Sequence, residues 1–364
     1  MFIFLFIFSC FFSYYIFFNL SKKLHVPQIV FNIFYLIKFI YILYFIYFNI
    51  TDPFGTDTRA HFRNNDNFNP DTFIIGDNLV YGINLFFSKI LLLDFETTNL
   101  LTIFPSFLAT LLLLSIITNI DEMKKKLLLY LILISPSLNF WTNGLNKDML
   151  SYFTLSIFLY GIFKKQFLLI TLSVVLTFFI RPYLTFVILT SLIVFLTFKI
   201  IFRFRYNFTF KNILLVVFLI SASLTVLYII LYFLLGSFGI QFLNGDIFNI
   251  ISNLQNHYTN TRLGIPLDQL FVFRLFNYLF YPLPWSYQTT EILLAIIMFE
   301  NLLILFTFIY FIINWKNLLN QNYLYFFGLM SFIFLLLMLS LITSNYGIAF
   351  RQKWMIVPFI LILF

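Results

Sequence analysis

The feature of this sequence that most limits its fold is a series of long apolar runs separated by short polar segments. A helix needs about 20 mostly apolar residues to cross the ~30 Å hydrocarbon core of a bilayer, and shorter spans are tolerated inside a bundle. The runs predict helices near residues 2–20, 29–50, 99–118, 127–142, 149–163, 166–180, 183–198, 212–235, 291–313, 322–343 and 353–364. The expected fold is therefore all-α: a polytopic integral membrane protein with about 10–11 transmembrane helices, in which residues 1–364 form a single transmembrane helical domain.

The composition excludes a water-soluble globular enzyme. Apolar residues make up 62% of the chain and charged residues only 10%, whereas a soluble domain carries about a quarter charged residues. Cys10 is the single cysteine, so no disulfide can form within the chain. The net charge of +8 comes from short Lys and Arg clusters between apolar runs, a pattern that orients a chain in a bilayer. We therefore expect no nucleic-acid partner.

The distribution of positive charge predicts which segments face the cytoplasm. No basic residue precedes the first apolar run, and Lys22 and Lys23 follow it, as in a retained anchor whose N-terminus lies outside. If the chain alternates from there, the inner segments hold twelve Lys and Arg residues and two acidic residues. The outer segments hold nine Lys and Arg residues and eleven acidic residues. The non-cytoplasmic loops 51–98 and 237–290 hold most of the carboxylates, so we expect the function at the outer face.

The first outer loop contains a candidate acid–base group. Asp57 and His61 are four residues apart and share one face if the stretch is helical, and Asp52 precedes them. Such a group can take a proton from a sugar hydroxyl. The alternative is a solvated loop with a capping aspartate. No metal-ligand spacing recurs in the chain, so we expect neither a metal nor another cofactor.

Two tight junctions between apolar runs carry candidate substrate-binding residues. Lys147 and Asp148 follow Asn143-Gly144, and Arg181 precedes a proline between two runs of about 15 residues. Charges near a bilayer are costly unless they have a partner or a ligand, which favours binding of phosphate or sugar. The alternatives are capping of a helix by Asp148 and snorkelling of Arg181 to the headgroups.

Two later outer segments add four more candidate phosphate-binding residues. Arg262 and Arg274 lie in the second long loop, and a guanidinium offers a bidentate fork to phosphate. Arg351 and Lys353 lie just before the last apolar run, on the side where positive charge is not expected. Binding of an anionic ligand is one reason for positive charge on the outer side of the membrane.

Several short motifs between residue 50 and the end of the chain resemble those of bacterial membrane proteins of surface-polysaccharide assembly. These are O-antigen-polymerase-like proteins and relatives of the GT-C glycosyltransferases. The motifs are Pro136-Ser137 with Phe140-Trp141 and Lys147-Asp148, Arg181-Pro182-Tyr183, Pro282-Leu283-Pro284-Trp285, and Asn345 with Gly347-Ile348-Ala349-Phe350-Arg351-Gln352-Lys353. GT-C enzymes carry an acidic motif in the first outer loop, where Asp52 or Asp57 matches by position.

The resemblance implies a GT-C-like or polysaccharide-polymerase-like bundle in the bacterial cytoplasmic (inner) membrane. It implies a polyprenyl-linked sugar or oligosaccharide as the substrate. The expected partners are this glycolipid, membrane lipid and other glycan-assembly proteins. The function class that competes with a glycosyltransferase or polysaccharide polymerase is transport, by a glycolipid flippase or a small-anion transporter. Transporters often show internal repeats and polar groups at the midplane, whereas here no repeat is visible and the polar groups gather at one face.

Overall fold

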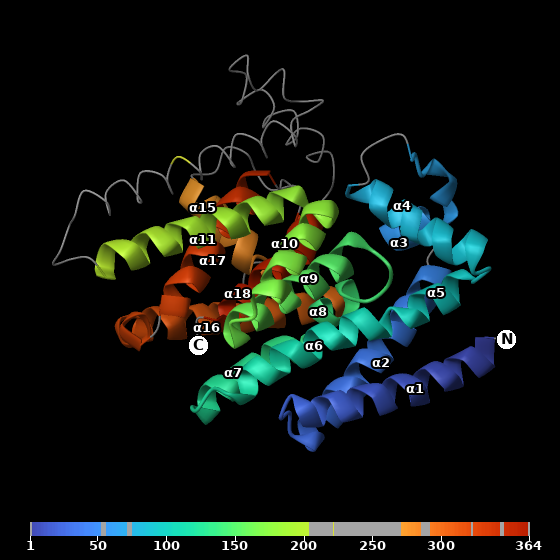
Figure 1. Ribbon diagram of the computed structural model, residues 1–364, viewed down its shortest axis with the longest axis horizontal. Helices are drawn as coiled ribbons and strands as arrows, with labels where there is room; N and C mark the ends of the chain where they lie inside the picture. Colours follow the sequence, from blue (N-terminus) through green and yellow to red (C-terminus); the bar gives the residue numbers. More distant parts are fainter. Residues whose placement is uncertain are drawn as a thin grey trace, which may run out of the picture. The chain divides into compact units, whose positions relative to one another are not determined.

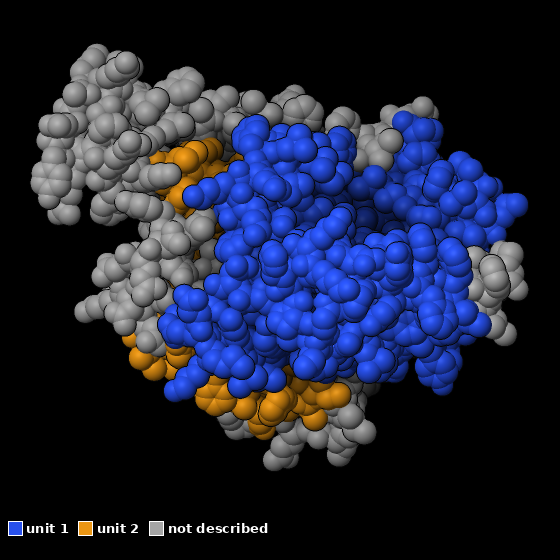
Figure 2. All heavy atoms as spheres, turned by 60° about the horizontal axis from the view of Figure 1, so that its bottom comes forward, with its two compact units in different colours: residues 1–181 blue, residues 182–364 orange. Residues whose placement is uncertain are grey.

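The structure is a computed structural model that describes residues 2–51, 56–70, 75–203, 221, 271–284, 292–321, 323–342 and 346–362. This part of the chain is all-helical and contains no strand. The chain divides into two compact units, residues 1–181 and residues 182–364, which Figure 2 colours blue and orange. The prediction of a single transmembrane domain stays a prediction.

Unit 1 consists of a long helical hairpin, a segment of short helices and a group of packed helices. Its elements are α1 (Phe2–Lys23), α2 (Gln28–Thr51), α3 (Asp57–Arg63), η1 (Asn65–Asn67), α4 (Asp77–Leu85), η2 (Phe86–Ile90), α5 (Phe95–Leu101), α6 (Ile103–Thr118), α7 (Met123–Ile134), α8 (Pro136–Trp141), α9 (Lys147–Lys164) and α10 (Phe167–Ile180). Helix α6 is buried nearly along its whole length because it packs against α1, α2 and α9 (Figure 1). Helix α9 in turn packs against α10.

Unit 2 is built around one central apolar helix. Its described elements are α11 (Pro182–Arg203), α15 (Phe271–Phe280), α16 (Ile292–Gln321), α17 (Tyr323–Ile342) and α18 (Tyr346–Ile362). Helix α17 packs against each of the other four. The helix predicted at 212–235 and the part of the second long loop before Phe271 lie outside the described residues, apart from Ser221.

Three described helices are long and apolar enough to cross a membrane. They are α2, the run Phe95–Thr118 formed by α5 and α6, and Ala295–Ile313 within α16. Large apolar side chains on two of these helices face outward: Ile29 on α2 is 75% exposed and Ile313 on α16 is 74% exposed. An apolar surface of this kind needs lipid or another protein to cover it, because water solvates it poorly. The structure thus supports membrane association of an all-helical chain.

Several boundaries differ from those predicted by hydropathy. The predicted helix 127–142 is two helices, because Pro136 lacks an N–H and begins α8 at its first position, where no N–H is needed. The loop 51–98 contains α3, α4 and the start of α5, since short helices lack the length that hydropathy detects. The last helix begins at Tyr346, so Arg351 and Lys353 lie within it and do not precede it.

Candidate functional site

The start of α4 lies next to the end of α10. The backbone N–H of Gly76 donates to the carbonyl of Phe179 at 2.9 Å. Gly76 has φ +62° and ψ −118°, a conformation that residues with a Cβ rarely adopt. Glycine therefore suits the residue before α4, and its hydrogen bond holds the start of α4, with Asp77 in the first turn, beside the end of α10, where Arg181 follows.

Asn146 fixes the start of α9. Its side-chain oxygen accepts the backbone N–H of Met149 at 2.8 Å, which is an N-cap, and its amide donates to the hydroxyl of Thr58 at 3.3 Å. Lys147 and Asp148 are consequently the first two residues of the helix. The N-cap thus belongs to Asn146 and not to Asp148, which leaves the carboxylate of Asp148 available to another partner.

The turn that leads into α9, residues 142–146, is fully buried apart from a few atoms and is held by side chains of α5 and α6. The three contacts are Leu145 N–H to Asn99 Oδ1 at 3.0 Å, Gly144 N–H to Thr102 Oγ1 at 3.2 Å, and Ser106 hydroxyl to Asn143 Oδ1 at 2.9 Å. The first two bonds satisfy backbone N–H groups that no helix satisfies, and the third joins two side chains. The direction of Lys147 and Asp148 is therefore set by a helix pair distant from them in sequence.

The side chains of His61 and Lys147 meet at one carboxylate oxygen of Asp77, and we call these three residues the carboxylate triad. His61 Nε2 lies 3.0 Å from Asp77 Oδ1, and Lys147 Nζ lies 2.7 Å from the same oxygen. The carboxylate of Asp77 is half-exposed, Lys147 is partly exposed and His61 is buried. The hydrogen bond from His61, followed by the hydrogen bond and charge of Lys147, holds the pKa of Asp77 well below its usual range. Asp77 is thus an anion at neutral pH.

The ring of His61 has a defined orientation. Its edge meets Tyr81, with the ring centroids 5.0 Å apart and an interplanar angle of 84°. Because Nε2 donates to Asp77, Nδ1 points elsewhere; it is buried and has no hydrogen-bond partner within the described part of the chain. Buried polar atoms without a partner are uncommon and often belong to catalytic groups.

Asp148 and Arg181 form a second, buried ion pair. Arg181 Nη2 donates to Asp148 Oδ1, and the two side chains are 10% and 5% exposed. The pair connects the first turn of α9 to the end of α10. Burial makes such a pair sensitive to the loss of either partner, because the remaining charge is left in a medium that solvates it poorly.

The structure places four of the residues that the sequence singled out in two contacts: His61 and Lys147 both bind Asp77, and Asp148, next to Lys147 in the chain, pairs with Arg181. Asp57 lies on the exposed surface of α3, and the stretch that carries it is helical as the acid–base interpretation requires. The described contact of His61 is nevertheless with Asp77. Asp52 and Arg262 lie outside the described residues.

The remaining predicted residues belong to unit 2. Lys353 is buried, and its ammonium donates to Asn301 Oδ1 at 2.8 Å and to the carbonyl of Tyr281 at 3.3 Å. Arg274 on α15 is buried, and Arg351 on α18 is half-buried. Lys353 therefore ties α18 to α16 and to the end of α15, a structural contact within unit 2.

Sequence reasoning missed Asp77 and the side chains that hold the turn. The signal for Asp77 is its place directly after a glycine and before an apolar helical pattern, which is typical of a helix N-terminus. Asn99, Thr102 and Ser106 recur every three or four residues inside an apolar run, which places them on one face of a helix. A polar face inside such a run indicates contact with other polar groups.

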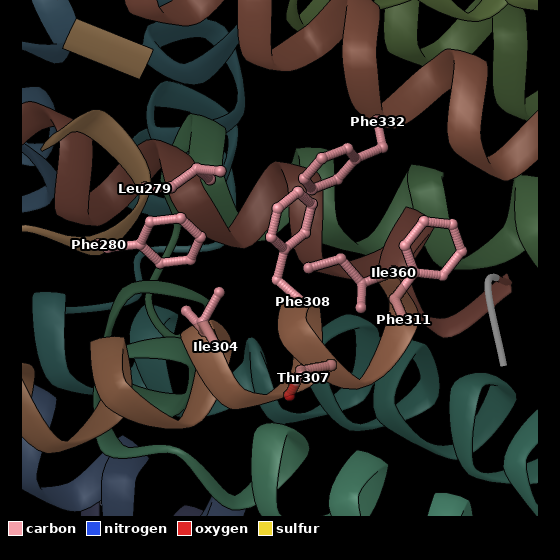
Figure 3. A pocket seen from close by; sticks show the side chains of 8 residues that line it. All are labelled: Leu279, Phe280, Ile304, Thr307, Phe308, Phe311, Phe332 and Ile360. Atoms are coloured by element: carbon pink, nitrogen blue, oxygen red, sulfur yellow. The ribbon is translucent and has the colours of Figure 1, made fainter. Parts of the chain in front are cut away.

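Two other kinds of site find no support among the described residues. No group of three or more His, Cys, Asp or Glu side chains there is arranged to hold a metal ion. Unit 2 has a pocket lined by Thr307 and otherwise apolar side chains of α15, α16, α17 and α18 (Figure 3), but its cavity volume is only about 10 Å³. That is room for about one water molecule, which is too small for a sugar.

Comparison of the chain with protein-family models, with curated proteins and with solved structures finds no match. The carboxylate triad combines an anion, an imidazole and an ammonium group, and the buried pair adds the guanidinium of Arg181, whose partner Asp148 is the residue next to Lys147. Such a set can transfer a proton and can also stabilise negative charge.

Proposed function

We propose that the chain is a multi-pass enzyme of the bacterial cytoplasmic membrane that acts in surface-glycan assembly. In this proposal it is a glycosyltransferase or a repeat-unit polymerase that uses a sugar or oligosaccharide on a polyprenyl-phosphate carrier. The supports are the apolar exposed helices, the charged groups at helix ends and the motifs Lys147-Asp148 and Arg181-Pro182-Tyr183. The observation that carries the proposal is the carboxylate triad, with Asp77 bound to both His61 and Lys147.

The triad suits the two demands of glycosyl transfer from a lipid phosphate. The acceptor hydroxyl attacks the anomeric carbon, the bond from that carbon to the phosphate oxygen breaks, and the hydroxyl proton passes to a base. A carboxylate with a depressed pKa is a weak base but orients an imidazole well. We therefore assign Asp77 to orient His61, and Nδ1 of His61 to accept the proton, which requires that binding of the acceptor sugar exposes this buried atom.

The leaving phosphate carries the negative charge that the broken bond releases. Lys147 is partly exposed beside Asp77, and a fixed cation there would stabilise this charge in the transition state. Arg181 remains a further candidate for binding the carrier phosphates. The lipid part of the donor would reach the site laterally through the bilayer, which agrees with a site at the ends of apolar helices.

The experiment replaces single residues of the carboxylate triad in the bacterium that makes the protein. Asp77→Asn and His61→Ala should each lower glycan assembly about 100-fold or more, the usual size of a general acid–base contribution. Asp66→Asn is the matched control, because Asp66 is an exposed carboxylate in the same segment and lies 3.6 Å from Lys89. Glycan chains are compared at matched membrane levels of each protein, and normal chains with Asp77→Asn would refute this assignment.

Asp57→Asn separates the two candidate carboxylates. Loss of glycan with Asp57→Asn but not with Asp77→Asn would return the catalytic role to Asp57, the residue predicted from sequence. The glycan that remains also distinguishes the reactions. Single repeats exported without polymerised chains indicate a polymerase, and loss of one sugar indicates a transferase.

A flippase or small-anion transporter is the second candidate function. One observation favours it: Lys38 is buried in the middle of α2, a helix of membrane-spanning length, and ionisable groups at such a depth are common along transport pathways. Intermediates trapped in the cytoplasmic leaflet of a deletion strain would support the transporter and contradict the enzyme.

A further inference from the structure

Lys38 is a buried lysine in an apolar helix. It is the eleventh residue of α2, about 15 Å along the helix from Gln28, and its side chain is 1% exposed. It belongs to the buried face of α2 together with Phe34, Ile42 and Phe45. An apolar residue of similar length would fill this place without the several kcal/mol that an ammonium group costs there. Stability of α2 alone therefore gives no reason for a lysine.

Both described contacts of Lys38 are made with the surroundings of the turn that enters α9. Its Nζ donates to the hydroxyl of Thr142 at 2.6 Å, and it lies 5.3 Å from the centroid of the Tyr152 ring. Thr142 donates in turn to the carbonyl of Leu138 at 2.6 Å, so its hydroxyl has both a donor and an acceptor. Lys38 thus fixes the junction between α8 and the turn.

This junction leads directly to the carboxylate triad. Thr142 begins the turn 142–146, and Lys147, the next residue, binds Asp77 at 2.7 Å. Farther along the same face of α2, the ring of Phe45 lies against Gly144, where an added Cβ would come within 2.1 Å of it. Helix α2 therefore contacts the turn at two places, of which Lys38 supplies the polar one.

We propose that Lys38 is a positioning residue of the candidate site, which holds Thr142 and thereby presents Lys147 to Asp77. The role is exerted through the Lys38–Thr142 hydrogen bond, and Lys38 itself touches no substrate. This inference rests on the proposed function only in experiments that measure glycan assembly. The contact between Lys147 and Asp77 can be measured without any assay of glycan assembly.

The readout is the reactivity of the Lys147 amine in the purified full-length protein. An amine-acetylating reagent, quantified at Lys147 by mass spectrometry, reports how firmly Lys147 is held by Asp77. Lys38→Met keeps the apolar length of the side chain and removes the donor, and Thr142→Val removes the acceptor at nearly the same volume. Each should raise the labelling rate of Lys147 about two- to fivefold, the range that a partly exposed ion pair is worth. Asp77→Asn, which removes the partner itself, sets the upper limit.

Two controls make the result specific. Thr142→Ser keeps the hydroxyl and should leave Lys147 close to its wild-type rate. Lys125→Met removes another buried lysine, which lies 2.6 Å from Glu122 at the start of α7, and should not change Lys147. In a double variant Lys38→Met/Thr142→Val the rate should rise no further than in either single variant, because both remove one bond.

The outcomes separate this proposal from the proposed function. If Lys147 is labelled at the wild-type rate in Thr142→Val, the positioning role is overturned. This test holds even if the Lys38→Met protein does not accumulate in the membrane, because Thr142→Val removes the same hydrogen bond. An equal rise with Lys125→Met overturns it too, since the effect would then be general loosening. If Lys38→Met raises labelling while Asp77→Asn and His61→Ala both leave glycan chains unchanged, the positioning role stands and the catalytic role proposed for the carboxylate triad fails.

Discussion

At the scale of single residues, Gly144 is the position where the fold tolerates least change. It has φ +76°, which favours glycine, and a Cβ built on it would lie 2.1 Å from Cε1 and 2.4 Å from Cζ of Phe45. Both effects act in the buried turn that carries Lys147 and Asp148. The lack of a side chain at Gly144 is thus what lets α2 approach this turn.

Gly144→Ala should destabilise the protein by about 2–5 kcal/mol, which combines the strain of a positive φ with overpacking against Phe45. Thermal unfolding of the purified protein in detergent measures this. In a Phe45→Leu background, which removes the ring edge that the new methyl would strike, the same substitution should cost less. Equal cost in both backgrounds would mean that backbone strain alone is responsible.

The stability provided by Asp77 should depend on pH in a predictable direction. Contacts with His61 and Lys147 lower the pKa of Asp77 in the folded state relative to its ordinary value of 3.8. A group whose pKa is lower in the folded state stabilises the fold fully above its unfolded pKa, and this stabilisation is lost as the pH falls toward the folded value. The difference in Tm between wild type and Asp77→Asn should thus be present at about pH 5 and shrink below about pH 4.

The effect is expected to be small, at most about 1 kcal/mol, because the carboxylate of Asp77 is half-exposed and screened by solvent. Asp66→Asn, at a more exposed carboxylate, serves as the control and should show a smaller difference. A Tm difference that grows as the pH falls would contradict the assigned contacts of Asp77.

At the scale of elements, the first turn of α9 is joined to the end of α10 by the buried Asp148–Arg181 pair. Arg181→Met should cost about 3–5 kcal/mol, because it leaves the Asp148 charge buried without its guanidinium. The double variant Arg181→Met/Asp148→Leu should be more stable than the single variant, since two apolar side chains replace the pair. Unfolding temperatures of the two proteins, measured side by side, test this.

The result also bears on the substrate-binding role predicted for Arg181. A double variant that is as stable as wild type but makes no glycan would show that the pair is needed for activity and not for folding. If the two substitutions are simply additive in stability, Asp148 and Arg181 do not act as an energetic unit.

At the scale of the whole molecule, the charge distribution predicts a topology that can be tested directly. In a Cys10→Ala background, cysteine introduced at the exposed position Asn67 should react with a membrane-impermeant thiol reagent added to intact cells. Cysteine at the exposed position Lys124 should react only after the membrane is opened. Strong labelling at Lys124 in intact cells would invert the topology and place the carboxylate triad on the cytoplasmic side.

The candidate site shows which information the sequence holds and which it lacks. Lys147, Asp148 and Arg181 were predictable one by one, because charges between apolar runs are conspicuous. The pairing of Asp148 with Arg181 and of His61 with Asp77 was not, since each pair is separated by 16 or 33 residues. Asp77 itself was missed because its place after a glycine indicates a helix N-terminus and does not reveal its partners His61 and Lys147.

The sequence by itself determined the helical class, most helix positions and the apolar character of the chain. These follow from runs of apolar residues, which are local properties and leave a helix as the way to satisfy the backbone. Only the tertiary structure decided that α5 and α6 hold the turn before α9, and that Lys38 reaches this turn from α2. Such contacts depend on which faces of uniformly apolar helices meet, and in helices apolar all round the hydrophobic periodicity does not specify this.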